Sequence, residues 1–414
     1  MRFSRIQIGR PQQLAALLLL FFLAQCVWVV SRQELSPQDY RYARCGREMW
    51  ERPSPLAGYF TTCGNLNGDG TFAYRAAGLP LTVERLVLLG ADKLRAPENR
   101  LYAQGTLNGS TWEARHELLS VKYLLHLPFI FFAVWLGGGL WWVSRRLFGS
   151  EGAIFALGLY CFSPLMVGWA SQVGADIVGA WGAFGLIFTS IAVAHTLYAP
   201  REVVLWNWRR ILLMGLSMAI CIGAQFSLWI LLVPALAFML WVGHVRRGAV
   251  LAIFASASVT GLVLLWALYS FRPLAFGKAL VNADWLEVSA QSFSWNAVGP
   301  LLATSFLQNG VGLVLLLVVS LVTFAVWKRS RFFGTAAPLL TGVLLVVLAL
   351  RLHFAGFTFL FVALPFLVLF MAGVSADLLQ SRYAVLANAV IVGVLVANAM
   401  IDIYSLLHLT SRSR

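Results

Sequence analysis

The stretch "SPQDYRYA" at positions 36–43 combines a helix start with a carboxylate that has two uses. Ser36 suits an N-cap, Pro37 the first helical position, and Asp39 the third, where a carboxylate accepts hydrogen bonds from free backbone N–H groups. A carboxylate held there can equally take a proton from a hydroxyl group. The residues alone leave both interpretations of Asp39 open, as helix cap and as catalytic base.

Other polar residues that suit the same chemistry fall in segments expected on the same face of a membrane. Acids and a histidine can act as a general base or hold a metal ion, and cations can hold a phosphate leaving group. Plainer roles are open too, such as an acid that complements a helix dipole or a cation at the interface. The residues concerned are His116, Glu117, Lys122, Asp176, Lys278, Arg351 and His353.

The composition places these residues in a membrane protein. The chain has 414 residues, of which 60% are hydrophobic and 12% charged, and its mean hydropathy is +0.78. Soluble domains are about 45–50% apolar, so lipid must solvate much of this surface. The net charge of +14 is explained by basic residues in cytoplasmic loops, and no nucleic-acid partner is expected.

Apolar runs of about 17–25 residues are long enough to cross a bilayer. Eleven such runs predict an all-α polytopic fold, with 211–244 either one long helix or two short ones that turn near Gln225. The predicted spans are 13–30, 118–143, 152–170, 176–198, 211–226, 228–244, 249–271, 309–327, 333–351, 355–376 and 383–408.

Basic residues set the expected orientation. Paired arginines such as Arg145-Arg146, Arg209-Arg210 and Arg246-Arg247 fall in alternate loops, which favours a cytoplasmic N-terminus. Most of the 17 acidic residues then lie in one outer loop, 31–117. The expected organisation has five parts: the cytoplasmic N-terminus with the first span (1–30), this outer loop (31–117), the middle spans (118–271), a second outer loop (272–308) and the last spans (309–414).

The first outer loop is too long to be a bare connector, so it is expected to carry its own structure. Besides the helix at 36–50, the pattern of residues 82–95 predicts an amphipathic helix on the membrane surface. Cys45 and Cys63 are the two cysteines of this loop. In an oxidising compartment they can form a disulfide, but the sequence supplies no geometry to decide it.

Several of these stretches together resemble the C-type membrane glycosyltransferases, the group that includes protein O-mannosyltransferases and lipid A aminoarabinose transferases. The likeness rests on the long first outer loop, on "RRLFG" at 145–149, on "SPLMVGWASQVGAD" at 163–176 and on "RLHFAGFTFLFVALPF" at 351–366. In that family an Asp-Glu pair in the first outer loop, followed by Tyr, is implied in catalysis. The chain departs from this pattern, because Gln38 replaces the first acid and Asp39 remains.

The resemblance implies a role for each candidate residue. Asp39 is expected as the base, with Glu34 as the other acid that can take the role. Asp176 matches the family's acid after the third span, and His116, followed by Glu117, resembles its "His-Pro-Pro" histidine. Arg351, with His353 and Lys278, is expected near the lipid phosphate. Metal use varies in the family, so a divalent ion held by Asp39, His116, Glu117 or Asp176 is an open option.

The implied activity is transfer of a sugar from a polyprenyl-phosphate donor to an acceptor hydroxyl, with inversion, on the outer face of a bacterial plasma membrane. The acceptor, whether protein, lipid or glycan, is not specified by the residues. Two other functions are weighed against this one: a carrier, flippase or inactive homologue that handles lipid-linked sugars, and a polysaccharide ligase or polymerase. A carrier is expected to bury ionisable groups within its spans, and Asp402 is the main residue of that kind.

Overall fold

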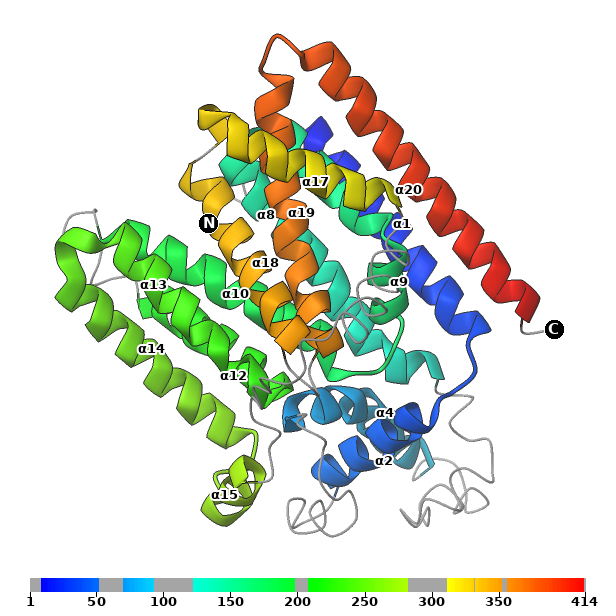
Figure 1. Ribbon diagram of the computed structural model, residues 1–414. Helices are drawn as coiled ribbons and strands as arrows, with labels where there is room; N and C mark the ends of the chain where they lie inside the picture. The colour runs from blue at the N-terminus through cyan, green and yellow to red at the C-terminus, as the bar shows by residue number, and fades with distance from the viewer. Residues whose placement is uncertain are drawn as a thin grey trace, which may run out of the picture. The chain divides into compact units, whose positions relative to one another are not determined.

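The computed structural model describes residues 9–51, 70–92, 122–197, 208–281, 311–330, 332–351 and 356–412. The regular elements in these ranges are helices, drawn in Figure 1. They cluster into two compact units, unit 1 formed by Met1–Arg32, Val134–Trp169 and Ser289–Arg414, and unit 2 by Gln33–Ala133 and Ala170–Val288.

Unit 1 is an apolar bundle built around α19. The side chains of α19 from Phe359 to Val374 are almost all buried, and α18 packs along this helix, with Gly342 allowing close approach of Leu367. Figure 1 shows α1 beside α20, the last helix of the chain. The helices that lie wholly in this unit are α1 (Arg10–Arg32), α17 (Val311–Val326), η4 (Lys328–Ser330), α18 (Phe333–Arg351), α19 (Gly356–Leu379) and α20 (Ala384–Arg412).

Unit 2 joins a layer of apolar helices to a pair of helices from the first predicted outer loop. Its elements are α2 (Pro37–Glu51), α4 (Thr71–Asp92), α10 (Ala175–Thr196), α12 (Trp208–Ala224), η2 (Phe226–Leu231), α13 (Leu232–Val242), η3 (His244–Arg246), α14 (Arg247–Ala267) and α15 (Pro273–Val281). Two further helices, α8 (Lys122–Cys161) and α9 (Pro164–Ala170), cross the boundary between the units along the chain.

Small residues let α10 pack closely on α12. A Cβ added to Gly182 would lie 2.5 Å from the backbone nitrogen of Cys221, and one added to Gly185 would lie 2.8 Å from Ser217 Oγ. These glycines belong to "GAWGAFG" at 179–185, where small residues recur every third position. Such spacing is typical of close helix packing in membranes, and the structure confirms that interpretation of the motif.

The predicted spans correspond to apolar helices, but not all of these helices are long enough to be counted as crossings. Among the described residues, six helices are long and apolar enough to cross a membrane, and three shorter apolar helices lie at Phe226–Val242, Gly312–Val326 and Phe333–Ala349. The helix α8 covers most of the predicted span 118–143 and the first part of the predicted span 152–170, joined at a kink where Gly149 has φ 80°, a backbone conformation that favours glycine. The later part of the second span contains α9. The number of crossings, their orientation and the five-part division therefore stay predictions.

The uncertain stretch 211–244 consists of two helical pieces. The helix α12 ends at Ala224, and η2 begins at Phe226 after an extended Gln225.

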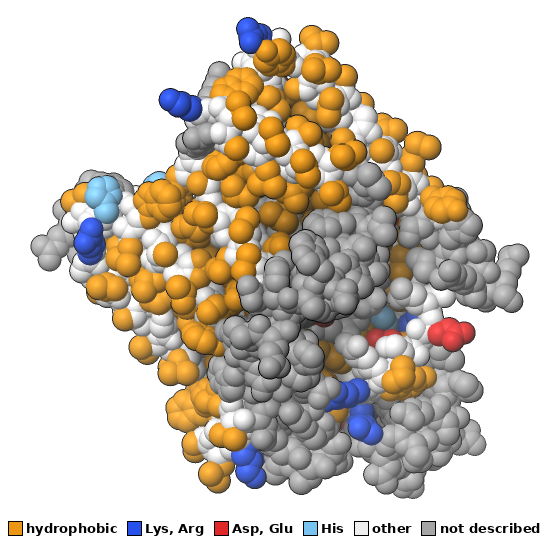
Figure 2. Space-filling view, viewed as in Figure 1, with side chains coloured by type: hydrophobic (Ala, Val, Ile, Leu, Met, Phe, Trp, Pro, Cys, Tyr) orange, Lys and Arg blue, Asp and Glu red, His pale blue; other side chains and the backbone are white. Residues whose placement is uncertain are grey.

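Apolar side chains cover most of the described surface in the view of Figure 2, over α14, α17 and α20 among others. In a membrane protein this is the surface that lipid would cover.

The helices α2 and α4 cross with their backbones in contact. A Cβ on Gly46 would lie 2.1 Å from the Tyr74 carbonyl oxygen, and one on Gly78 would lie 2.1 Å from the Gly46 carbonyl carbon. The Tyr42 and Tyr74 rings stack at the crossing with centroids 4.0 Å apart. Only glycine leaves room for so close an approach, so this crossing fixes how α2 is placed.

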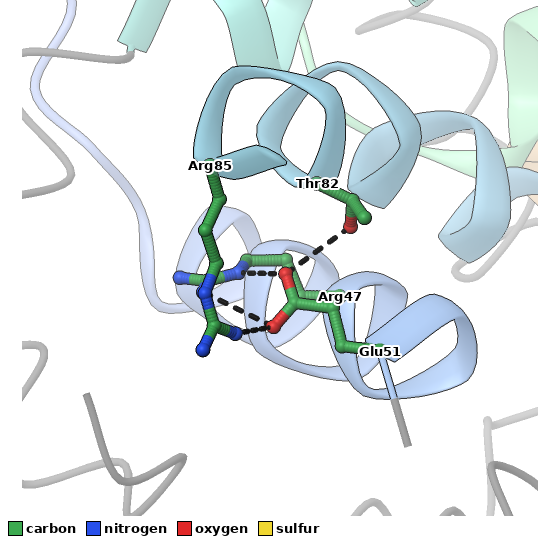
Figure 3. Close-up of polar contacts among 4 residues, drawn as sticks. All are labelled: Arg47, Glu51, Thr82 and Arg85. Atoms are coloured by element: carbon green, nitrogen blue, oxygen red, sulfur yellow. Dashed lines mark hydrogen bonds and ion pairs between the residues drawn. The ribbon is translucent and has the colours of Figure 1, made fainter. Parts of the chain in front are cut away.

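A charged cluster around Glu51 ties the far end of α2 to α4 (Figure 3). Arg47 donates to Glu51 Oε1 at 2.8 Å and to Oε2 at 3.2 Å, the Thr82 hydroxyl donates to Oε1 at 3.2 Å, and Arg85 also pairs with this carboxylate. The Glu51 and Arg47 side chains are each only 9% exposed. Partly buried, multiply bonded pairs of this kind hold two helices in one register far better than exposed pairs do.

The predicted surface helix at 82–95 is longer than expected at its start. It is part of α4, which begins at Thr71 and contains Pro80. The residues 71–81 were missed because Pro80 reads as a helix end, whereas tertiary packing on α2 continues the helix through it. Val83, Leu86 and Val87 share an exposed apolar face, as the pattern of residues 82–95 predicted, and Leu79, one turn earlier, extends it. Leu94, the fourth residue predicted on this face, lies outside the described residues.

Candidate functional site

Asp39 caps α2 in the way that the sequence predicts. The backbone N–H of Ser36 donates to Asp39 Oδ2 at 2.7 Å, and the backbone N–H of Asp39 donates to Ser36 Oγ at 3.2 Å. This reciprocal pair is a capping box, which satisfies two donors at the helix start. The Asp39 side chain is only 5% exposed. The cap interpretation is thus confirmed, and one carboxylate oxygen is committed to it.

Gln38 fastens the start of α2 to the turn that precedes α10. Its Nε2 donates to the carbonyl oxygen of Val173 at 3.0 Å. The same Nε2 and Asp176 Oδ2 each lie 3.5 Å from the point where a Cβ on Gly174 would sit. The structure therefore brings Asp176, at the start of α10, to the same turn as the Gln38-Asp39 pair. A carboxylate in place of the Gln38 amide has no N–H to donate to this carbonyl.

The first turns of α8 supply a cation and an imidazole to this region. The Lys122 ammonium donates to the carbonyl oxygen of Gln33, in the segment that leads into α2. One turn later, His126 Nδ1 lies 2.7 Å from the carbonyl oxygen of Ser171. A carbonyl can only accept, so Nδ1 carries the proton. His126 is 3% exposed, and its Nε2 has no hydrogen-bond partner among the residues that the structure describes.

These groups form one electrostatic neighbourhood. The negative charge of Asp39 favours the positively charged forms of both Lys122 and His126. The positive charge of Lys122 disfavours a charge on His126. Glu34, which is exposed, also acts on Lys122. We define the α2–α8 site as Asp39, Gln38, Lys122, His126 and Asp176. It lies wholly within unit 2 and combines carboxylates, a cation and an imidazole, the groups needed for proton transfer and for binding a negatively charged ligand.

Of the other residues expected at the site, two are described, and each lies on a different helix. Lys278 is exposed on α15, and no contact with the α2–α8 site is seen for it in the described part of the chain. Arg351 is the last residue of α18, in unit 1, and His353, His116 and Glu117 lie outside the described residues. Within the described ranges, no group of three or more His, Cys, Asp or Glu side chains is suited to hold a metal ion.

The described cysteines fall into two groups, buried thiols and one that is disulfide-bonded. Cys26, Cys161 and Cys221 are buried thiols within apolar helices, whereas Cys45, in α2, is disulfide-bonded. Cys63 lies outside the described residues, so the Cys45–Cys63 pairing stays a prediction. The disulfide at Cys45 restrains α2 close to the Glu51 cluster.

Sequence reasoning missed His126. It lies within the apolar run "YLLHLPF" at 123–129, where it reads as one more membrane-embedded side chain. The available signal was its spacing of four residues from Lys122, which places both side chains on one helix face. Its partner Ser171 lies 45 residues further along the chain, and no local pattern reveals a contact of that kind.

Comparison with known proteins gives likeness of structure but not of sequence. No protein-family profile and no curated protein matches the sequence. Among solved structures, apo ArnT from Cupriavidus metallidurans, a lipid A aminoarabinose transferase, is similar with a TM-score of 0.58 and 14% identity, covering 96% of this chain and 75% of ArnT. The undecaprenyl phosphate-bound form of ArnT gives a TM-score of 0.55 at the same identity and coverage.

A second kind of transferase shows the same architecture. The apo oligosaccharyltransferase from Archaeoglobus fulgidus is similar with a TM-score of 0.53 and 11% identity, covering 99% of this chain and 56% of that protein. Identities this low establish the fold alone. The fold of this chain is similar to the folds of ArnT and of this oligosaccharyltransferase, which are both GT-C membrane glycosyltransferases.

Proposed function

We propose that this chain is a membrane glycosyltransferase that moves a sugar from a polyprenyl-phosphate donor to an acceptor hydroxyl, with inversion at the anomeric carbon. The fold supports the general class, and one of the similar structures is bound to undecaprenyl phosphate. The proposed location is a bacterial inner membrane, with the site facing the periplasm. The basic residues of the alternate loops support that orientation.

The observation that carries the proposal is the meeting of three chain segments at the α2–α8 site. The start of α2, the start of α8 and the turn before α10 each contribute a polar group, and hydrogen bonds from Gln38, Lys122 and His126 join them. Asp39 and His126 are buried, and burying polar side chains is costly unless they are hydrogen-bonded. Three segments fixed in this way can hold reacting groups in a constant geometry, which is the main requirement for transfer from a phosphate leaving group.

The proposed reaction is a single displacement. The acceptor oxygen forms a bond to the anomeric carbon as the bond from that carbon to the phosphate oxygen breaks, and the electron pair leaves with the polyprenyl phosphate. The hydroxyl proton passes to a base of the α2–α8 site, for which Asp39 is the carboxylate expected from sequence and Glu34 the alternative. Cations neutralise the departing phosphate; Arg351, His353 and Lys278 are proposed for this role.

The test uses the purified chain in proteoliposomes with undecaprenyl phosphate that carries a radiolabelled hexose or aminopentose. Wild-type protein is expected to release undecaprenyl phosphate and transfer the label to an added membrane extract. Asp39→Asn keeps an acceptor for the Ser36 N–H but removes the negative charge, which the site needs whether Asp39 takes the proton or stabilises a protonated base, so kcat is expected to fall by about 100-fold.

Ser36→Ala is the matched control. It removes the hydroxyl cap at a stability cost of about 1 kcal/mol but leaves the Asp39 carboxylate in place, so its rate is expected to stay near that of wild type. Equal losses in Ser36→Ala and Asp39→Asn would show that Asp39 matters only as a cap. A wild-type protein that leaves every labelled donor intact would contradict the proposed activity.

One observation favours a second function, a carrier of lipid-linked sugars. Asp402 on α20 is 1% exposed and accepts a hydrogen bond from Gln25 on α1, in helices apolar enough to cross a membrane. Buried acids in such helices often mark transport pathways. Transbilayer movement of fluorescent undecaprenyl phosphate that is lost in Asp402→Asn, without any sugar transfer by wild type, would favour the carrier.

A further inference from the structure

We infer that His126, and not Asp39, accepts the proton of the attacking hydroxyl; this inference rests on the proposed function. The departure of Gln38 from the family pattern raises the question of which group serves as base. At position 38 the side chain is an amide whose N–H is used to bind Val173. Position 39 retains a carboxylate, but its Oδ2 accepts the Ser36 N–H.

His126 is held with one nitrogen engaged and the other open. Its Nδ1–H donates to the Ser171 carbonyl at 2.7 Å, which fixes both the tautomer and the ring plane. The lone pair of a neutral ring then lies on Nε2, on the edge of the ring that faces away from Ser171. This nitrogen is buried and has no partner in the described ranges. A buried polar atom without a partner needs an explanation, and a substrate hydroxyl supplies the missing donor.

The surrounding charges suit a ring that starts neutral and becomes protonated. The charged groups that act on His126 are Asp39 from α2 and Lys122 from one turn earlier on α8, and the turn before α10 presents the Ser171 carbonyl. Burial is the largest influence that disfavours a positive charge on the ring before reaction, and the Lys122 ammonium adds to it. The Asp39 carboxylate favours the imidazolium. Asp39 thus acts as a positioning and charge-stabilising residue, because it does not itself take the proton.

The proton balance of the step is complete within the proposed reaction. The acceptor oxygen loses its proton to His126 Nε2 as it bonds to the anomeric carbon, and polyprenyl phosphate leaves with the electron pair of the broken bond. The imidazolium afterwards returns its proton to water. The step needs no oxidant or reductant.

The variants His126→Asn and His126→Ala distinguish the role of Nδ1 from the role of Nε2. Asn places an amide N–H close to the position of Nδ1, so it can keep the bond to Ser171 while it removes the base; Ala removes both. We expect His126→Asn to keep the thermal stability of wild type, with kcat lowered by at least about 100-fold. Its KM for the undecaprenyl-phosphate sugar should stay within about threefold of the wild-type value. Its rate should not rise with pH through the titration range of histidine. Added imidazole should restore part of the rate of His126→Ala.

Histidine-labelled wild-type protein provides a readout that does not depend on turnover. Nitrogen NMR should show the His126 ring protonated at Nδ1 when it is neutral; protonation at Nε2 would overturn the inference. A His126→Asn protein with the wild-type rate and pH profile, in a preparation whose wild type transfers sugar, would overturn the inference and leave the proposed function standing. A wild type that transfers no sugar would overturn the proposed function and this inference with it.

Discussion

Gln38→Glu is the most informative single substitution, because it restores the acid that the family pattern expects and removes the bond that this structure shows. The Gln38 amide donates to the Val173 carbonyl at 3.0 Å. A glutamate cannot donate, so its carboxylate would face that carbonyl oxygen. The new carboxylate would also lie next to Asp39 in the chain. It would lie near Asp176, because the Gln38 side chain and Asp176 Oδ2 both lie close to Gly174.

The expected magnitude follows from the lost hydrogen bond. A net contribution of about 1 kcal/mol is typical of one intramolecular bond, and because Gln38 is exposed, the new carboxylate can turn toward water and avoid most of the repulsion. The turn that Gln38 holds contains Ser171, the partner of His126. If the whole 1 kcal/mol appears in the barrier, the rate of transfer falls by about fivefold, since about 1.4 kcal/mol corresponds to a factor of ten.

The assay compares Gln38→Glu with Gln38→Leu, which loses the bond without adding a charge. Both variants are measured for thermal unfolding in detergent and for release of undecaprenyl phosphate from its labelled sugar. We expect similar moderate losses in the two. A Gln38→Glu protein that transfers faster than wild type, together with an unaffected Gln38→Leu, would refute this reasoning and mark position 38 as a vacated catalytic position.

Three further substitutions test the packing that places the site. Gly46→Ala puts a Cβ 2.1 Å from the Tyr74 carbonyl oxygen and is expected to lower thermal stability by at least about 1–3 kcal/mol, whereas Gly138→Ala, whose Cβ would meet no atom within 4 Å, serves as its control. Glu51→Gln removes the carboxylate charge that pairs with Arg47 and Arg85, so a loss of about 3 kcal/mol is expected. Unchanged unfolding would show that the cluster does not hold α2 on α4. Asp402→Leu removes the acceptor of the Gln25 amide and should destabilise the protein by about 1–3 kcal/mol. The double variant Gln25→Leu, Asp402→Leu should recover most of this stability in the same unfolding assay. Additive losses of stability would contradict the pairing.

The sequence predicts the helices well because apolar periodicity and length are local properties. The extents of α1 and α10 match the spans expected at 13–30 and 176–198 to within a few residues. The capping box of Asp39 was predictable for the same reason, since it needs only residues three positions apart.

The site itself depends on contacts that no local pattern contains. Gln38 binds a carbonyl 135 residues away, and a backbone carbonyl leaves no trace in the amino-acid sequence. The backbone contact between Gly46 and Gly78 is equally hidden, because a glycine in a helix reads only as a weak helix former. Asp39 and Asp176 were found from their residue types, whereas His126 required the fold.

The most direct test of this account is photocrosslinking with an undecaprenyl phosphate sugar that carries a diazirine on the sugar ring. Wild-type protein in proteoliposomes should be labelled at the start of α2, at Lys122–His126 or in the turn before α10, and excess unlabelled donor should suppress the label. Suppressible labelling confined to other helices, such as α20, would contradict the assignment of the α2–α8 site as the place where the sugar is transferred.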